Sequence, residues 1–140
     1  MSDSGSHWVV RRSIPSRTDA GAELMNELLE KLEQCEWIQQ HIFGVNLAVE
    51  EALVNAIKHG NHEDAAKKVH IEFRLTDDYF YARIADEGQG FDPAEVPDPC
   101  ADENLERPGG RGIMLMRNFM TQVDYNDIGN EVVMLKKARG

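Results

Sequence analysis

Three polar residues, Glu51, Asn55 and Lys58, recur at helical spacings of four and three positions. At about 100° per residue, these spacings place the three side chains on one face of a helix. Apolar patches flank that face on both sides. This predicts the floor of a pocket, where a carboxylate and an amide need partners. A structural helix whose polar residues bond to neighbouring backbone fits the same pattern. The patches consist of Ala48, Val49, Ala52, Leu53 and Ala56 on one side, and of Leu47 and Val54 on the other.

Two glycine-bearing stretches later in the chain could contact a ligand. The first, DEGQG at residues 86–90, follows an expected strand. Its Asp86 could accept a hydrogen bond from an exocyclic amine, while its glycines let the backbone come close. The second, GGRG at residues 109–112, precedes an expected helix, whose free amides suit phosphate. Neither fits a Walker loop or a dinucleotide fingerprint, and each alone is more simply a glycine-rich turn. Together with the polar face they predict a nucleotide site.

The elements that must position these residues follow from the hydrophobic pattern. Consecutive strands paired as hairpins indicate a mainly antiparallel sheet with helices packed on one face. A Ser-x-x-Asp capping box at residues 16–19 is expected to begin the first helix. Gly60 is expected to end the second helix in a left-handed cap. The expected strands are 7–14, 69–75, 79–85, 122–125 and 131–137, the helices about 16–34, 41–60 and 113–120, and the long loop 86–112.

Composition narrows the function classes. The chain has 140 residues, with 15 basic and 25 acidic side chains, so its formal charge of −10 argues against a general nucleic-acid binder. Cys35 and Cys100 fit no metal-ligand spacing and are expected to be free thiols. No apolar run reaches membrane-spanning length, and the first residues do not form a secretory signal. We therefore expect a cytoplasmic protein without direct membrane or nucleic-acid contacts.

The three motifs together resemble those of the GHKL (Bergerat-fold) ATPases, and especially the bacterial anti-sigma factor serine kinases. EALVNA at residues 51–56 matches the family's N box, residues 86–90 its first glycine box, and GGRGIMLM at 109–116 its second. RNFM at 117–120 is similar to the anti-sigma branch. The resemblance covers about residues 8–137 and implies an α+β fold. That fold is a two-layer α/β sandwich with a mainly antiparallel mixed sheet and helices on one face. It would form one domain over 1–140, with 1–6 disordered and 91–108 as the ATP lid.

The resemblance also implies roles for individual residues. Asn55 would hold Mg²⁺, whose preferred ligands are oxygens, and Asp86 would receive the adenine amino group of ATP. Glu51 would be the general base for a serine hydroxyl, with its pKa raised by the apolar flanks. His59 taken alone is equally a structural histidine. Further ATP contacts are implied for Gly88, Gly90, Gly109, Gly110, Gly112 and Ile113 at the hinges and phosphate cradle, and for Lys58, His59, Arg107 and Arg111 at the phosphates.

By the same resemblance, the chain is expected to be an ATP-dependent protein-serine kinase. It would phosphorylate a small anti-anti-sigma protein, sequester a sigma factor, and form a homodimer through its N-terminal strand and first helix. A binding module without kinase activity, which uses ATP or no nucleotide to shape a partner-binding surface, is one alternative. A detached histidine-kinase catalytic domain is another. Glu51 favours the serine kinase, because a pure nucleotide binder needs no base at that place.

Overall fold

The computed structural model describes residues 8–35, 37–88, 110–126 and 129–138, without the side chains of 110–113 and 115. The expected order of elements is confirmed, with one π-helical turn added after the second helix. The elements are β1 (Trp8–Pro15), α1 (Thr18–Gln34), α2 (Gln39–Val54), η1 (Asn55–Gly60), β2 (Lys68–Leu75), β3 (Tyr79–Ala85), α3 (Gly110–Phe119), β4 (Gln122–Tyr125) and β5 (Glu131–Lys137).

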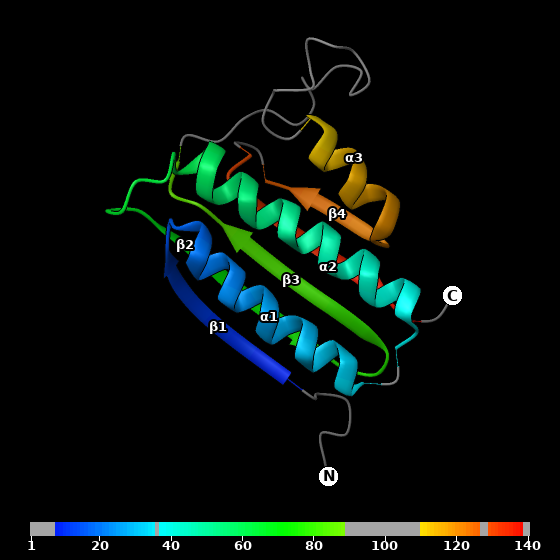
Figure 1. Cartoon of the computed structure of the whole chain (residues 1–140). Coiled ribbons are helices and arrows are strands. Elements are labelled where there is room, and N and C mark those ends of the chain that lie inside the picture. The colour runs from blue at the N-terminus through cyan, green and yellow to red at the C-terminus, as the bar shows by residue number, and fades with distance from the viewer. Residues whose placement is uncertain (1–7, 36, 89–109, 127–128, 139–140) are drawn as a thin grey trace.

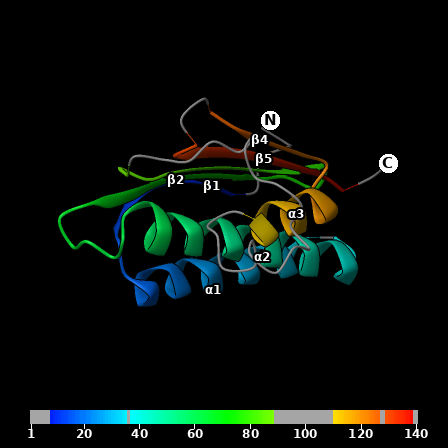
Figure 2. The same cartoon turned by 90° about the horizontal axis from the view of Figure 1, so that it is seen from above.

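The strands form one five-stranded sheet in the order β1-β2-β3-β5-β4. Every strand pair that the structure describes is antiparallel, so the parallel component of a mixed sheet is absent from this part of the chain. The helices lie together on one face of the sheet, with α2 between α1 and α3 (Figures 1 and 2). The predicted two-layer α+β architecture is thereby confirmed.

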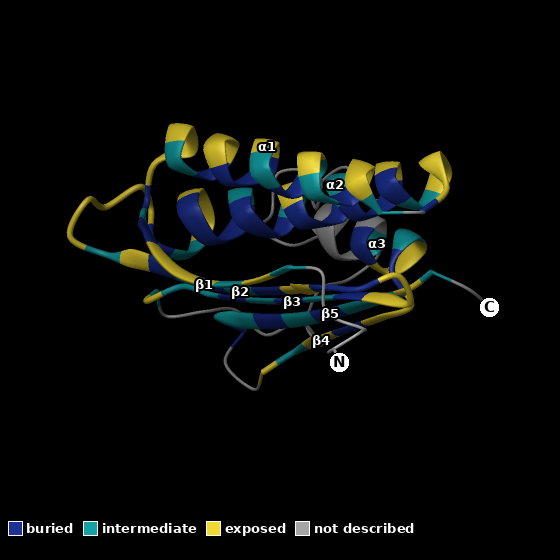
Figure 3. Ribbon diagram, turned by 90° about the horizontal axis from the view of Figure 1, so that it is seen from below, coloured by how far each residue is buried: buried dark blue, intermediate teal, exposed yellow. Residues whose placement is uncertain are grey.

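The core lies between the two layers, where both hydrophobic periods point inward (Figure 3). In β2, alternate residues from Val69 to Leu75 are buried, as a strand with one covered face requires. The predicted apolar face of the central helix is buried. Helix α2 packs on both α1 and α3 and also contacts β3 of the sheet. Within the described residues, no helix has the length and apolar character needed to cross a membrane.

Two local predictions were wrong. Helix α1 begins at Thr18 with Arg17 as its N-cap, and no side chain makes the capping hydrogen bond. The predicted cap Ser16 instead donates its hydroxyl to the carbonyl of Lys67 at 2.7 Å, because β1 runs to Pro15 and carries Ser16 toward the start of β2. Gly60 does not adopt the left-handed conformation, and the positive φ angles fall on His62 and Glu63.

Candidate functional site

A cavity lies where the central helix changes its winding. α2 is a regular α-helix to Val54, and η1 continues it as a π-helix, a form that is common at functional sites. The wider turn brings Asn55, His59 and Gly60 to the same cavity wall. The other walls come from β3 and from the β4–β5 hairpin. Among the described residues, the lining is Ala52, Asn55, Ala56, His59, Gly60, Ile84, Asp86, Tyr125, Gly129, Asn130, Glu131 and Val132.

Asp86 can lie against η1 because Gly60 and Gly88 have no side chains. A β-carbon on Gly60 would overlap the Asp86 carboxylate, and one on Gly88 would overlap the carbonyl of Gly60. The backbone N–H of Gly88 donates to Asp86 Oδ1 at 2.8 Å. Burial raises the pKa of the Asp86 carboxyl above its usual range, although this hydrogen bond and the nearby Lys67 and His62 oppose the rise. The glycines therefore allow an acidic side chain to line the cavity.

Asn55 supplies an amide to the same cavity. The residue is 9% exposed, and within the described part of the chain its Nδ2 atom has no hydrogen-bond partner of good geometry. Nearby, burial strongly raises the pKa of the Tyr125 hydroxyl, while the amide of Asn55 is close enough to lower it in part. The Tyr125 hydroxyl also contacts the sulfur of Met116 on α3 at 4.0 Å. A buried amide with unused hydrogen-bonding capacity indicates a place for a ligand.

Glu51 lies one turn before Asn55 and is partly buried. Desolvation raises the pKa of its carboxyl, opposed by His59 and reinforced by the charge of Glu50. Glu51 is not among the residues that line the cavity, and neither is the exposed Lys58. The π-turn explains the place of Lys58, since the wider winding brings His59, and not Lys58, to the cavity wall. A regular helical period could not have predicted this difference.

The turn between β4 and β5 contributes residues that the motifs did not indicate. Asn126 Oδ1 accepts hydrogen bonds from the backbone N–H groups of Gly129, Asn130 and Glu131 at 2.8, 3.0 and 3.2 Å. Gly129 has a φ of 79°, a conformation that glycine adopts at little cost. The carbonyl of Asn130 accepts the N–H of Asp86 at 2.8 Å. This hairpin turn therefore fixes the backbone of the acidic residue.

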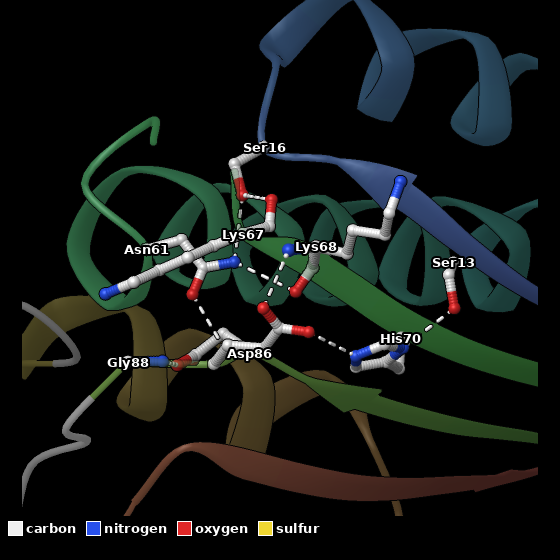
Figure 4. Close-up of polar contacts among 9 residues, drawn as sticks. Ser13, Ser16, Asn61, Lys67, Lys68, His70, Asp86 and Gly88 are labelled. Atoms are coloured by element: carbon white, nitrogen blue, oxygen red, sulfur yellow. Dashed lines mark hydrogen bonds and ion pairs between the residues drawn. The ribbon is translucent and has the colours of Figure 1, made fainter. Parts of the chain in front are cut away.

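Asn61 is a second residue that sequence reasoning missed. It is completely buried, and its Nδ2 donates to Ser16 Oγ at 2.8 Å and to the Lys68 carbonyl at 3.0 Å. Its Oδ1 accepts the N–H of Glu87 at 2.8 Å. Figure 4 shows how these bonds join the end of η1 to the loop after β3. The only sequence signal was an asparagine after Gly60, which reads equally well as part of a turn.

The remaining predicted site residues belong to the second half of the proposed nucleotide site. Gly90, Arg107 and Gly109, like the whole predicted lid 91–108, lie outside the described residues. The expected disordered segment 1–6 also lies outside them. Helix α3 begins at Gly110, so Gly110 to Ile113, which include Arg111 and Gly112, form its first turn. The amides of a first helical turn have no partner within the helix, and a phosphate could use them.

The chemistry of the donor set fits a nucleotide with Mg²⁺. The described residues contain no cluster of three or more His, Cys, Asp or Glu side chains that could hold a metal ion alone. Magnesium often takes only one or two protein ligands together with phosphate oxygens and water. The buried amide of Asn55 would suit that role, and the Asp86 carboxylate would suit an exocyclic amine.

Comparisons with known proteins agree with this geometry. A family model described as the histidine kinase-like ATPase domain matches residues 14–136. The chain is 32% identical over 91 residues to the serine/threonine-protein kinase BtrW of Bordetella bronchiseptica, covering 64% of each chain. It therefore spans just under two thirds of that relative's length. It is 36% identical over 99 residues to the anti-sigma F factor of Oceanobacillus iheyensis, covering 66% of this chain and 67% of the relative.

A solved structure has the same fold. The crystal structure of the RsbU and RsbW domains of a Mycobacterium tuberculosis protein aligns with a TM-score of 0.62. The alignment covers 94% of this chain and 32% of that chain, at 12% identity. At so low an identity, the likeness concerns the fold alone.

Proposed function

The chain belongs to the histidine kinase-like ATPase domain family, in its anti-sigma factor serine kinase branch, and from this membership we propose that it is an ATP-dependent protein-serine kinase. Its target would be a serine of an anti-anti-sigma protein, and it would also sequester a sigma factor. The observation that supports this proposal best is the cavity that Asn55 and Asp86 share, with a partly buried Glu51 one turn away.

Different residues of the cavity would contact different parts of the bound nucleotide. Asp86 would accept the adenine amino group, and its close packing on Gly60 would hold the carboxylate in place for that contact. Asn55 would bind Mg²⁺ through its amide oxygen. His59, on the same wall, would face the phosphates. The bound nucleotide would supply the transferred phosphoryl group and the metal would neutralise its charge. Lys58, Gly90, Arg107, Gly109, Gly110, Arg111, Gly112 and Ile113 remain candidates for further ATP contacts.

Glu51 would act on the protein substrate. A general base must accept the proton of the attacking hydroxyl, and it works best when its pKa lies near the operating pH. Burial moves the pKa of Glu51 in that direction. Glu50, the neighbouring acid, is exposed. The two carboxylates therefore differ in environment, and Glu51 has the more suitable one for this role.

Membership of this branch supports a proposal for the partners. We infer a cytoplasmic protein that exchanges between a sigma factor and an anti-anti-sigma protein as its nucleotide state changes. A homodimer through β1 and α1 is part of the same proposal. β1 is an edge strand of the sheet, and an edge strand can add further strands. Light scattering at high protein concentration should give a dimer mass, and a monomer mass would contradict this part.

Mixing the protein with ATP, Mg²⁺ and candidate serine-bearing partners tests the main proposal. Phosphoserine on the partner is the expected product. Acid-labile phosphohistidine would indicate a detached histidine-kinase domain instead. Saturable nucleotide binding with no phosphoryl transfer to any co-purifying partner would favour the binding module.

A further inference from the structure

The loop that carries Asp86 is anchored from outside the cavity by its next residue, Glu87. The Glu87 carboxylate accepts the backbone N–H of Lys68 at 3.2 Å and pairs with His70 Nε2 at 2.8 Å. Its own N–H is held by Asn61. Residues 86 to 88 are thus fixed on one side by the end of η1 and on the other by β2 (Figure 4). Neither contact with β2 belongs to the cavity itself.

His70 is oriented in turn by Ser13. The two residues are paired across β1 and β2, and Ser13 Oγ lies 2.7 Å from His70 Nδ1. With Nδ1 engaged by the serine hydroxyl, the ring directs Nε2 at Glu87. His70 alternates along β2 with the buried Val69 and Ile71, so its side chain lies on the face of the sheet opposite the helices. The side chains of His70 and Glu87 are 43% and 41% exposed. The hydrogen bond from His70 is the largest influence that holds the pKa of Glu87 below its usual range.

We propose that His70, oriented by Ser13, is a positioning residue for nucleotide binding, which acts through Glu87 on the loop that presents Asp86. This inference rests on the proposed function, in which Asp86 receives the adenine amine. Without the His70 contact, the hydrogen bond from the N–H of Lys68 would be the remaining contact of the Glu87 carboxylate among those described here, and the loop would be held less firmly. Part of the binding free energy would then be spent on ordering residues 86–88.

A serine, histidine and carboxylate in series also occur in acyl-transfer enzymes, where a buried carboxylate orients the histidine. Here both His70 and Glu87 are open to water. The series ends on the nucleotide loop, and this connection favours positioning over nucleophilic chemistry.

The arginines around the His70 ring are engaged by carboxylates other than Glu87. The charged groups around the ring are Arg11 and Arg12 of β1, Lys68 and Glu72 of β2, Arg83 of β3, and Glu87. Arg11, Arg12 and Arg83 are already paired with Glu72, Glu27 and Glu131, respectively.

Two substitutions of His70 separate the donor that Glu87 needs from the bulk of the ring. His70→Asn keeps an amide for Ser13 but is too short to reach Glu87, whereas His70→Gln keeps a donor near the Nε2 position. Arg74→Gln is the matched control. It breaks an exposed ion pair with Glu72 on the same strand and face, at 2.7 Å, which does not contact the loop. Calorimetry with ADP and Mg²⁺ on the full chain measures the affinity of each variant.

His70→Asn should raise the Kd for ADP by about three- to ten-fold, the range expected for the loss of one ordinary hydrogen bond, since exposure to water weakens the contact between His70 and Glu87. Arg74→Gln should not change it. His70→Gln should recover most of the affinity at neutral pH. Amide hydrogen exchange at residues 86–88 should be faster in His70→Asn and unchanged in Arg74→Gln.

The outcomes distinguish the proposed nucleotide-binding function from the role of His70. A wild-type chain that does not bind ADP contradicts the proposed function. A wild-type chain that binds, with the same Kd and loop exchange in His70→Asn, overturns the role of His70 alone. Equal losses in His70→Asn and Arg74→Gln would also overturn it, because the effect would then belong to the whole sheet face.

Discussion

The two parts of the central helical rod differ in what their residues do. α2 buries Ala48, Val49 and Leu53 with the regular period of an α-helix. η1, the π-turn that continues it, contains Asn55 and Gly60. The amide nitrogen of Asn55 has no hydrogen-bond partner of good geometry among the described residues, and the missing side chain of Gly60 leaves room for the Asp86 carboxylate. The first part stabilises the fold and the second presents polar groups to a cavity. A change of winding at Asn55 separates the two tasks, so substitutions on either side of it should have different consequences.

Asn55→Ala should have the largest effect on activity. The proposed metal loses the one protein ligand proposed for it, so phosphoryl transfer should fall to background and the Mg²⁺-dependent part of ATP affinity should disappear. Stability should change little, because an unsatisfied buried amide costs about 1–3 kcal/mol in the native protein. Transfer assays, calorimetry with and without Mg²⁺, and thermal unfolding measure the three quantities. A large loss of stability would place Asn55 with the packing residues of α2.

Glu51→Gln tests whether the last turn of α2 already belongs to the site. The substitution keeps the shape and removes the base, so transfer should fall by roughly 10²–10⁴ while ATP affinity persists. Glu50→Gln, at the exposed neighbouring position, is the control and should retain most of the transfer activity, because the charge of Glu50 is the smallest of the influences on the pKa of Glu51. Binding of the serine-bearing partner should survive in both variants. Full activity in Glu51→Gln would show that the base lies elsewhere.

Leu53→Ala should show the opposite pattern. Leu53 is 2% exposed, and truncating such a side chain typically costs about 2–5 kcal/mol of unfolding free energy. Well below the melting temperature, ATP affinity should remain at the wild-type value, because Leu53 does not line the cavity. Denaturant unfolding and calorimetry give the two numbers. A parallel loss of affinity at low temperature would mean that packing and binding are not separate.

Asp86→Asn should weaken ATP itself by roughly ten-fold or more, since a hydrogen bond to a charged group contributes about 1.5–3 kcal/mol. Asparagine can still accept the N–H of Gly88, so the loop should keep its conformation. Calorimetry with ATP measures the loss. If Glu51→Gln weakens ATP as much as Asp86→Asn does, the Glu51 carboxylate is structural.

The smallest expected effect is a gain in the stability of Asp86→Asn. Burial raises the pKa of Asp86, so this group favours the folded state below the ordinary carboxyl pKa of about 3.9 and loses that contribution as the pH rises through its folded value. Asn does not ionise, and Asp86→Asn should therefore be more stable than the wild type at pH 7, with no gain near pH 3. Thermal unfolding at both pH values measures the difference. A destabilised variant at pH 7 would mean that the ionised carboxylate is well solvated or paired.

Elements with a strong local period could be predicted from the sequence. The predicted bounds of β3, β4 and β5 agree with the structure, because alternate burial leaves a clear pattern in each. The start of α1 could not be predicted, since Ser16 bonds to Lys67, far away in the chain, and not to its own helix.

The site was predicted less completely, for the same reason. Asn55, His59 and Asp86 indeed face one cavity, but the motifs did not show that Lys58 turns away or that Tyr125 and Asn130 complete the lining. The role of Gly60 depends on the Asp86 side chain, which follows β3 and occupies the space that a Cβ at position 60 would need. The burial of Asn61 and the packing of Asp86 on Gly60 arise from tertiary contacts, which no local pattern encodes.

The strand order determines when the cavity can exist during folding. The pairings β2–β3 and β4–β5 are hairpins, whereas β1–β2 and β3–β5 join strands that are separated by helices. Such non-local pairings form late, because their loops must close before any contact compensates for the lost entropy. The cavity needs η1, β3 and the β4–β5 turn together, so it is complete only after β3 meets β5. A nucleotide bound there should slow unfolding and leave the refolding rate unchanged.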